Sequence, residues 1–373
     1  MPPQEASVGI LVDRQIEALI ESGAIRGRTP LGPDQIQPAS LDLRLGARGF
    51  RIRSGFLPEG VSVEDKLEKL KLYPIDLEAG AVLEIGQAYL FPLQESLALP
   101  EHLSARSNPK SSTGRLDLFT RIITDRCSRF DDIPAGYRGP IYLEVVPRSF
   151  PVRVRPGHTL NQIRFFDGPC ELDDEALRQE HEEAPLLFDA DGQPIPASKT
   201  LFDDGLVMRV GLHAQSQDGI VGYRARRYTP IVDLSEIGVL DIEEFWEPMR
   251  ASGSSLILEP EEFYIFASRD RVRVPAHLAA EMVAYDVGIG ELRTNYAGFF
   301  DNGFGDGRGQ LRGTAAVLEV RPHDVPFLIE DNQVFFKLKF YRTAEKPDRL
   351  YGDSNLGSSY QGQGLRLSKH FRQ

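Results

Sequence analysis

The sequence has few of the residues that mark secreted or membrane proteins. Its 373 residues include two cysteines, Cys127 and Cys170, too few for a disulfide framework or a four-thiolate zinc site. No apolar run approaches the roughly 18 residues that a membrane-spanning helix needs. Residues 1–5 have neither the basic start nor the apolar stretch of a signal peptide. We therefore expect a protein of the reducing cytoplasm with no membrane partner.

An excess of positive charge is also lacking. The chain has 43 Lys and Arg against 55 Asp and Glu, a net charge of −12, which argues against a broad nucleic-acid surface. An anionic ligand would have to be small and held by a local cluster of cations. Six basic residues between positions 106 and 129 form such a cluster, although any single arginine there more commonly belongs to a solvated face.

What the sequence does have is an internal repeat. Residues 143–145 (Leu-Glu-Val) recur at 318–320, and other positions of the two halves match at the same fixed offset. The repeat predicts two similar cores. The copies differ at one place. Residues 110–115 (Lys-Ser-Ser-Thr-Gly-Arg) correspond to 285–290 (Tyr-Asp-Val-Gly-Ile-Gly), which have no hydroxyl–arginine pair. One scaffold is used twice, and its chemistry is predicted to be confined to the first copy.

The hydrophobic pattern predicts a mainly β protein with short peripheral helices. We predict short strands over residues 41–46, 141–145, 152–155, 162–166 and 206–211. We predict short helices over residues 12–23, 61–72, 171–183 and 241–250, with Asp13 capping the first. Many short strands without alternating long helices favour a β-sandwich or barrel over a doubly wound sheet.

The predicted organisation is a first domain over residues 1–170, a linker over 171–200, a second domain over 201–343 and a tail over 344–373. The tail is rich in glycine and serine with few apolar anchors, so we expect it to be mobile without a ligand. Either it is a disordered terminus, or its tyrosines and glutamines form a lid that orders over a ligand.

Residues 110–115 are the first candidate for chemistry. Their three hydroxyls, two cations and one glycine suit a phosphate group or a polar heterocycle. The order of glycine, lysine and serine is not that of a Walker A loop. A serine-rich turn that caps a helix is the structural alternative.

Glu144 is the second candidate, because it lies within the apolar run of residues 141–146. Burial would raise the pKa of this carboxyl group toward that of a useful general base. Alternatively, it pairs with an arginine across the sheet. Glu319 recurs in the second copy without the serine–arginine motif, which favours a partly structural role, and both interpretations stay open.

Asp131 is the third candidate, since it precedes a glycine turn at Gly136 and then a strand. Its carboxylate could accept a hydrogen bond from a sugar hydroxyl. Residues 296–304 of the second copy offer a similar turn. Turn chemistry alone explains aspartate and glycine equally well.

Copy one resembles the dUTPase superfamily and, within it, the dCTP deaminases. The resemblance runs through residues 11–16, 38–46, 111–115, 139–144 and 155–166, and residues 358–364 resemble the family's C-terminal end, moved behind copy two. The whole chain is similar to a double-length bacterial form of dCTP deaminase. The resemblance implies two tandem dUTPase-like domains of β-barrel or jelly-roll type.

The resemblance also implies a reaction, the hydrolytic deamination of dCTP to dUTP and ammonia. Glu144 would be the general base that activates water for attack on C4 of cytosine. Ser111 would help to hold that water, and Arg115 would be the cation beside the reacting centre. The implied substrate contacts are Lys110 and Ser112 to phosphates, Asp131 to the sugar, Gln162 to the base or phosphates, and Tyr360 and Gln363 over the triphosphate.

The family uses no catalytic zinc, so the resemblance implies Mg²⁺ only as the companion of the triphosphate. It further implies a homotrimer or hexamer with sites between subunits. The chain departs from the family at Lys110, usually arginine, at Ser359, usually lysine, and at residues 126–129, where a small-residue–histidine pair is absent. The alternatives are a bifunctional enzyme that forms dUMP, with Asp131 or Asp132 activating water, a plain dUTPase, and a non-catalytic nucleotide-binding homologue.

Overall fold

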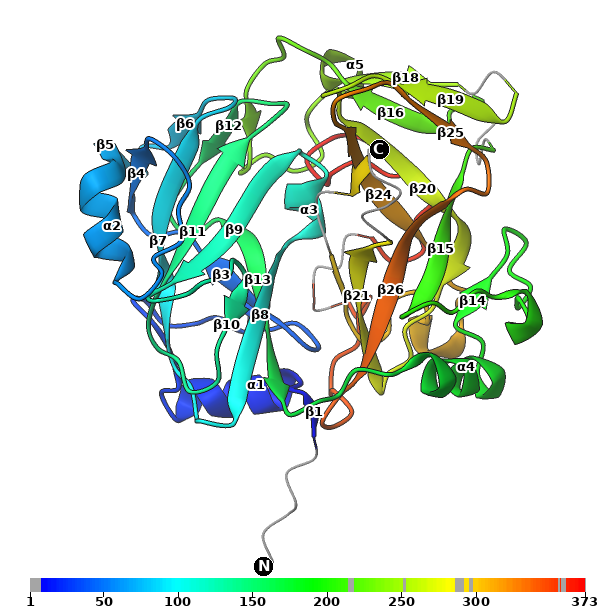
Figure 1. The fold of residues 1–373 in the computed structure, drawn as a ribbon, viewed down its shortest axis with the longest axis horizontal. Helices are drawn as coiled ribbons and strands as arrows, with labels where there is room; N and C mark the ends of the chain where they lie inside the picture. The colour runs from blue at the N-terminus through cyan, green and yellow to red at the C-terminus, as the bar shows by residue number, and fades with distance from the viewer. Residues whose placement is uncertain are drawn as a thin grey trace, which may run out of the picture. The chain divides into compact units, whose positions relative to one another are not determined.

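The computed structural model describes residues 8–213, 218–250, 253–285, 292–294, 298–354, 356 and 360–372. The chain forms two compact units (Figure 1). The first unit contains residues 1–170 together with two later segments, 228–240 and 343–348. The second unit contains residues 171–227, 241–342 and 349–373. None of the described helices is long and apolar enough to cross a membrane.

The first unit is built from three sheets whose strands are short and mostly antiparallel. One sheet contains β1 (Gly9–Ile10), β3 (Leu41–Arg44), β8 (Leu103–Pro109), β10 (Asp132–Ile133) and β13 (Thr159–Asp167). The second contains β2 (Ile25–Gly27), β4 (Arg48–Ile52), β5 (Lys71–Asp76), β7 (Ala88–Ala98), β9 (Leu118–Thr124) and β11 (Arg138–Pro147). The third contains β6 (Ala81–Leu83), β12 (Val152–Val154) and β17 (Val232–Asp233). The predicted mainly β class is confirmed.

Three helices accompany these sheets: α1 (Asp13–Glu21), α2 (Val63–Leu70) and α3 (Ser111–Gly114). The prediction that Asp13 caps α1 is wrong, because Val12 is the N-cap residue. Asp13 lies inside the first turn, where its Oδ1 accepts hydrogen bonds from the backbone N–H groups of Arg14 (2.9 Å) and Asp348 (3.2 Å). The carboxylate therefore ties the helix to a distant segment of the same unit.

The second unit repeats the strand pattern of the first. Its main sheet contains β14 (Leu187–Phe188), β15 (Leu206–Gly211), β16 (Gly222–Ala225), β18 (Trp246–Met249), β20 (Tyr264–Val272), β21 (Leu278–Ala284), β22 (Leu292–Thr294), β23 (Phe299–Phe300), β24 (Thr314–Pro322) and β26 (Val334–Arg342). β19 (Ser255–Leu258) and β25 (Phe327–Glu330) form a separate pair. β21 follows β8, and β26 follows β13, at the same offset that relates the two copies in the sequence. The sequence repeat is thus a repeat of strands.

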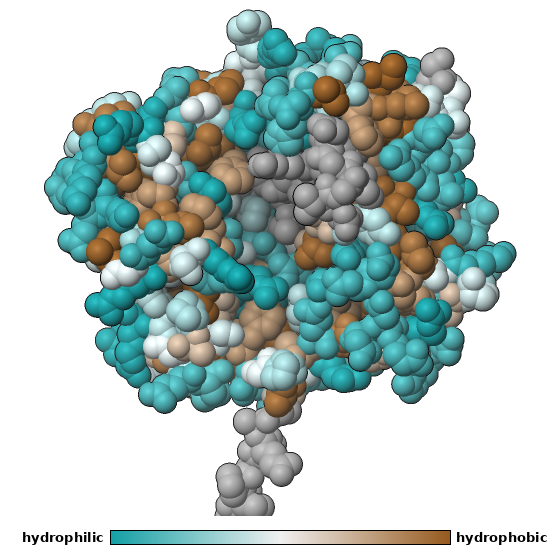
Figure 2. All heavy atoms as spheres, viewed as in Figure 1, coloured by the Kyte–Doolittle hydropathy of each residue, from teal (hydrophilic) through white to brown (hydrophobic). Residues whose placement is uncertain are grey.

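The described part of the second unit contains the α-helices α4 (Asp174–Glu183) and α5 (Ile242–Phe245). The helix predicted over residues 241–250 is only partly present, because the chain continues as β18, which pairs with β16. Residues 171–200, predicted to be a linker, contain α4 and β14 and contribute Leu177 and Leu186 to the core of this unit. The face shown in Figure 2 is covered largely by hydrophilic residues with apolar side chains scattered among them.

The tail has apolar anchors that the sequence analysis did not recognise. Leu367 is 2% exposed and Phe371 is 1% exposed. The ring of Phe371 lies 5.4 Å from that of Phe245 and 5.9 Å from that of Trp246. The described residues 360–372 are therefore packed within the second unit, contrary to the expectation of few anchors.

A segment from the second half of the chain completes the smallest sheet of the first unit. β17 pairs with β12 in parallel, with Val232 opposite Val152. Asp233 on β17 accepts hydrogen bonds from Arg155, at 2.6 and 3.0 Å, and from Arg153 at 3.3 Å. Burial raises the pKa of Asp233, but hydrogen bonds from Arg155, the Ser235 amide and Arg153 outweigh burial and hold that pKa well below its ordinary value.

We predict that Asp233→Asn destabilises the protein, because it removes the charge that both arginines bind. A carboxyl group with a depressed pKa stabilises the folded state above its unfolded pKa, about 4, and loses that contribution as the pH falls. At pH 7 the midpoint of thermal unfolding should fall by roughly 2–6 °C. The difference from wild type should shrink as the pH falls below about 4.

Differential scanning calorimetry from pH 3 to 7 checks this prediction. Asp191→Asn, in an exposed turn of the second unit, is the control and should leave the midpoint unchanged. Equal midpoints for Asp233→Asn and wild type at pH 7 would contradict the assignment.

Candidate active site

Glu144 lies in the middle of a row of side chains that crosses the second sheet of the first unit. Phe50 on β4 is opposite Leu90 on β7, Leu90 is opposite Glu144 on β11, and Glu144 is opposite Arg121 on β9. Directly opposed residues of antiparallel strands share a face of the sheet. Glu144 is 2% exposed. The sheet therefore holds one carboxylate between an apolar neighbour and an arginine.

Helix α2 covers this face. Its Val63 and Leu67 belong to an apolar cluster that also contains Leu90 and Tyr142. Tyr142 precedes Glu144 by two positions on β11, so both side chains point to the same side of the strand. The apolar cover removes water from around the carboxylate.

The partner of Glu144 is Arg121. The Nη2 and Nε atoms of Arg121 both donate to Oε2 of Glu144, at 2.8 and 3.1 Å. The guanidinium carbon lies 3.6 Å from the ring centroid of Phe130 and 4.9 Å from that of Phe119. The arginine pairing that the sequence left open is thus present, and two aromatic rings hold the arginine in place.

The second carboxylate oxygen of Glu144 has a different environment. Among the described residues, no group donates a hydrogen bond to Oε1. A β-carbon at Gly55 would lie 2.5 Å from Oε1 and 2.8 Å from Nη2 of Arg121. A side chain at position 55 would therefore have to displace the carboxylate and the guanidinium of this ion pair.

Burial raises the pKa of Glu144, and the charge and hydrogen bonds of Arg121 act in the opposite direction without cancelling that rise. The group is therefore a stronger base than an ordinary glutamate, while the arginine favours its ionised form. A buried carboxylate with one free oxygen can accept a proton from a bound water molecule.

The serine-rich turn forms α3, directly before β9. The Thr113 hydroxyl donates to the Leu160 carbonyl at 2.9 Å, which anchors the turn to β13. Ser112 and Arg115 are buried, and Ser111 is half-buried. The serines lie inside α3, whose N-cap is Lys110 with no side-chain cap, so the alternative of a serine turn that caps a helix is wrong. Ser111 is the most accessible of the three hydroxyl groups.

Lys110 is held by an acidic partner that sequence reasoning missed. Its Nζ forms an ion pair with the buried carboxylate of Asp42 on β3 and lies 3.1 Å from the Thr159 hydroxyl. Gln162 on β13 is directly opposite Asp42, and its Oε1 accepts a hydrogen bond from the Ser40 hydroxyl at 3.3 Å. Lys110 and Gln162 are thus brought together around Asp42.

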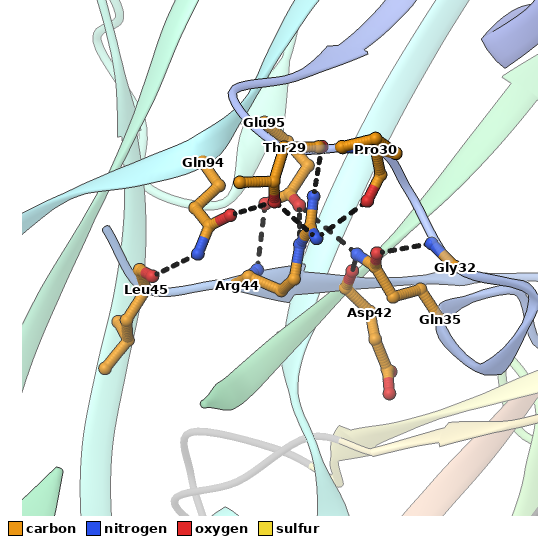
Figure 3. A network of polar contacts seen from close by, with 9 residues as sticks. All are labelled: Thr29, Pro30, Gly32, Gln35, Asp42, Arg44, Leu45, Gln94 and Glu95. Carbon is orange, nitrogen blue, oxygen red and sulfur yellow. Dashed lines mark hydrogen bonds and ion pairs between the residues drawn. The ribbon is translucent and has the colours of Figure 1, made fainter. Parts of the chain in front are cut away.

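A buried polar network supports the strand that carries Asp42 (Figure 3). Glu95, 1% exposed, accepts hydrogen bonds from Nε of Arg44 at 2.7 Å and from the Arg44 backbone N–H at 2.8 Å. The Gln35 amide donates to the Asp42 carbonyl at 2.9 Å and to Glu95 at 3.2 Å. The network fixes β3 against β7 and the loop that precedes it.

The predicted catalytic residues do not form one hydrogen-bonded group among the described residues. Among the described residues, Glu144 is hydrogen-bonded to Arg121 and to neither Ser111 nor Arg115. Asp131 has a left-handed backbone (φ 64°), and its Oδ1 accepts a hydrogen bond from the Ile122 N–H at 2.8 Å. Its carboxylate supports β9, as the turn interpretation predicts.

The two predicted lid residues belong to the second unit. Tyr360 is 6% exposed, and its hydroxyl accepts a hydrogen bond from the Lys369 N–H at 3.2 Å. The Gln363 side chain donates to the Ala315 carbonyl at 3.2 Å. Their closure over a triphosphate stays a prediction.

Several positions used in the sequence analysis lie outside the described residues, namely 286–290 and 295–297 from the comparison of the two copies and 358–359 from the family resemblance. Glu319, the counterpart of Glu144, is described and is buried on β24 opposite Ile265. Within the described ranges, no group of three or more His, Cys, Asp or Glu side chains could hold a metal ion.

Three residues of the site escaped the sequence analysis: Arg121, Gly55 and Asp42. Arg121 was counted among the clustered cations, but nothing in one sequence gives the register that places it opposite Glu144. Asp42 lies within a recognised motif, yet its link to Lys110 requires the fold. The glycine at position 55 carries no local signal beyond its type.

Both halves of the chain match models of one protein family. Residues 7–169 match the 2'-deoxycytidine 5'-triphosphate deaminase (DCD) N-terminal domain, and residues 173–371 match the C-terminal domain of the same family. A crystal structure of 2'-deoxycytidine 5'-triphosphate deaminase from Agrobacterium tumefaciens is 46% identical and has a TM-score of 0.87, covering 94% of this chain and 100% of that chain.

Curated relatives of the same family cover less than half of this chain. "dCTP deaminase, dUMP-forming" of Beutenbergia cavernae is 33% identical over 159 residues, which are 42% of this chain and 79% of the relative. A protein of the same name from Tropheryma whipplei is 33% identical over 159 residues, 42% of this chain and 77% of the relative. The resemblance seen in the sequence is confirmed.

We predict that Glu95→Ala destabilises the protein by about 3 kcal/mol, because removing the fully buried carboxylate leaves the Arg44 side chain, which is 14% exposed, without its partner. Urea denaturation followed by tryptophan fluorescence and circular dichroism measures the effect. Glu78→Ala, at an exposed turn position, is the control and should change the free energy of unfolding by less than about 0.5 kcal/mol. Similar losses for both variants would show that the network does not support β3.

Proposed function

Because the chain belongs to the dCTP deaminase family, in its double-length form, we propose that it catalyses the hydrolytic deamination of dCTP to dUTP and ammonia. The observation that carries the proposal is the environment of Glu144. The carboxylate is buried, Arg121 holds one of its oxygens, and no described group donates to the other. This arrangement suits a general base for water.

In the proposed reaction, water adds to C4 of cytosine while Oε1 of Glu144 takes one of its protons. The tetrahedral adduct then loses its amino group as ammonia, and the Glu144 carboxyl group returns the proton to that leaving group. Water and dCTP are consumed, and dUTP and ammonia are formed. The pKa of Glu144, raised by burial, suits both steps because the group must first accept and then donate a proton.

We propose that Ser111 and Arg115 complete the site from another copy of the chain, in a homotrimer or hexamer. Two observations support this proposal. Neither residue is hydrogen-bonded to Glu144 of its own unit, and Ser111 is half-buried on α3. Ser111 would position the attacking water, and Arg115 would lie beside the reacting centre.

The proposed substrate contacts follow the resemblance. Lys110, Ser112 and Gln162 would face the phosphates or the base, and the ion pair with Asp42 would fix the direction of the Lys110 side chain. Asp131 would accept a hydrogen bond from the sugar. Magnesium would enter bound to the phosphates as part of the substrate. Tyr360 and Gln363 would close over the triphosphate.

The second candidate is a bifunctional reaction that continues to dUMP, favoured by the name "dUMP-forming" of the curated relatives. It requires a second water molecule to attack a phosphate. Asp132 suits this task better than Asp131, since its side chain is 46% exposed and pairs with Arg106 at 3.5 Å. The Oδ1 atom of Asp131 is bound to a backbone N–H group.

The products of the full-length enzyme distinguish these candidates. We expect incubation with dCTP and MgCl₂ to yield dUTP and ammonia in equal amounts, measured by anion-exchange chromatography and an ammonia assay. Stoichiometric dUMP and diphosphate would replace the first candidate with the second. Absence of ammonia would refute both.

We predict that Glu144→Gln lowers the rate of ammonia release by about 100-fold to 10,000-fold, the usual contribution of a general base. The amide has the same shape but cannot take the proton from water. Binding of dCTP, measured by calorimetry, should change by less than about tenfold, a loss of under about 1.4 kcal/mol.

Glu247→Gln is the matched control, because Glu247 pairs with Arg224 in the same way but is 45% exposed in the second unit. It should leave the rate unchanged. Wild-type turnover by Glu144→Gln would exclude Glu144 as the base.

A further inference from the structure

We infer that Arg121 is a positioning residue that gives the two carboxylate oxygens of Glu144 different tasks. Arg121 holds Oε2, and Oε1 is presented to the attacking water. The inference deepens the proposed function and rests on it.

The first support is the geometry of the ion pair. An arginine fork usually engages both oxygens of a carboxylate with parallel hydrogen bonds. Here Nε and Nη2 both donate to Oε2, at 3.1 and 2.8 Å. Oε1 is left out of the fork, so the pair fixes the carboxylate without occupying both of its basic oxygens.

The second support is the rigidity of Arg121. Register places it directly opposite Glu144, and its guanidinium stacks on Phe130 at 3.6 Å and lies 4.9 Å from the Phe119 ring centroid. A planar guanidinium can stack on rings while donating in its plane, and an ammonium group cannot do both. Lysine at this position would supply the charge without the fixed direction.

The third support is Gly55, which lies beside the oxygen that Arg121 leaves out. A β-carbon there would be 2.5 Å from Oε1. A side chain at position 55 would thus occupy the space next to Oε1 that a water molecule needs. The absence of a side chain at this point matches the task assigned to Oε1.

Arg121 also determines the ionisation of Glu144. It is the charged group that faces Glu144 from β9, whereas Leu90 on β7 and Gly55 in the adjoining loop carry no charge. Burial raises the pKa of Glu144, and Arg121 opposes that rise. Without Arg121 the pKa rises further, so the carboxyl group becomes protonated, and inactive as a base, at a higher pH.

The test is the pH dependence of ammonia release from dCTP by the full-length enzyme. For Arg121→Gln we expect the acidic limb of the kcat profile to move to higher pH by about 1–3 units. We expect kcat to fall more than KM changes, because the base is affected and the phosphate contacts are not. A purely structural arginine would not move the limb.

Two further variants separate charge from direction. In Arg121→Lys the acidic limb of the kcat profile should lie closer to its wild-type position, because the charge is restored. The value of kcat should stay low, because the fixed direction is not restored. Gly55→Ala should lower kcat, provided that its thermal midpoint shows it to be folded. The acidic limb of its kcat profile should move less than the limb of Arg121→Gln. Arg224→Gln is the matched control, because Arg224 directs Nε and Nη2 to one oxygen of Glu247 on the exposed surface of the second unit.

An Arg121→Gln profile that superimposes on that of wild type, with equal kcat, would overturn the inference. If wild type releases no ammonia, the proposed function fails, and the inference is tested on the carboxyl group itself. Carbon-13 NMR of labelled glutamate should then show a higher pKa for Glu144 in Arg121→Gln than in wild type. An equal pKa would overturn the inference independently of activity.

Discussion

The rest of the site depends on one constraint: a carboxylate is held in the interior of a β-sheet. Glu144 can remain there only because β9 places Arg121 directly opposite and Phe119 and Phe130 hold that arginine in place. Removing a charge from water is costly, and the compensation is incomplete, since one oxygen is not satisfied by the described residues. The same desolvation that threatens stability makes the group a useful base.

The scaffold around this carboxylate occurs twice in the chain. The two copies have corresponding strands, but they differ in their candidate catalytic residues. β8 and β21, and β13 and β26, have identical lengths and are separated by one constant offset. Glu144 and Glu319 are both buried on the corresponding strands β11 and β24. The serine–arginine motif occurs only in the first copy, whereas the tail packs in the second unit, where Gln363 binds the Ala315 carbonyl. Each unit thus carries a different part of the family's pattern.

Periodicity in the sequence was enough for the mainly β class, the repeat and the five strands β3, β11, β12, β13 and β15, because alternation and repetition are local or regular signals. Residue types alone indicated residues 110–115, Glu144 and Asp131 as candidates, and the resemblance assigned their roles. The pairing of Glu144 with Arg121 could be anticipated only as an alternative, since strand register depends on contacts between residues far apart in sequence. Asp13 was wrongly predicted to cap α1; its carboxylate instead accepts a hydrogen bond from the backbone N–H of Asp348, 335 positions away, a contact that no local pattern indicates. The tail anchors Leu367 and Phe371 are too sparse to form a pattern.

The most direct measurement of the central claim is a crystal structure of the full chain with dCTP and magnesium, trapped by Glu144→Gln. The account predicts that C4 of cytosine lies beside residue 144, with an ordered water molecule within about 2.6–3.2 Å of the side-chain atom that Arg121 leaves free. Ser111 and Arg115 of another copy of the chain should line the same site. Cytosine bound elsewhere, with residue 144 enclosed and no water beside it, would contradict the account.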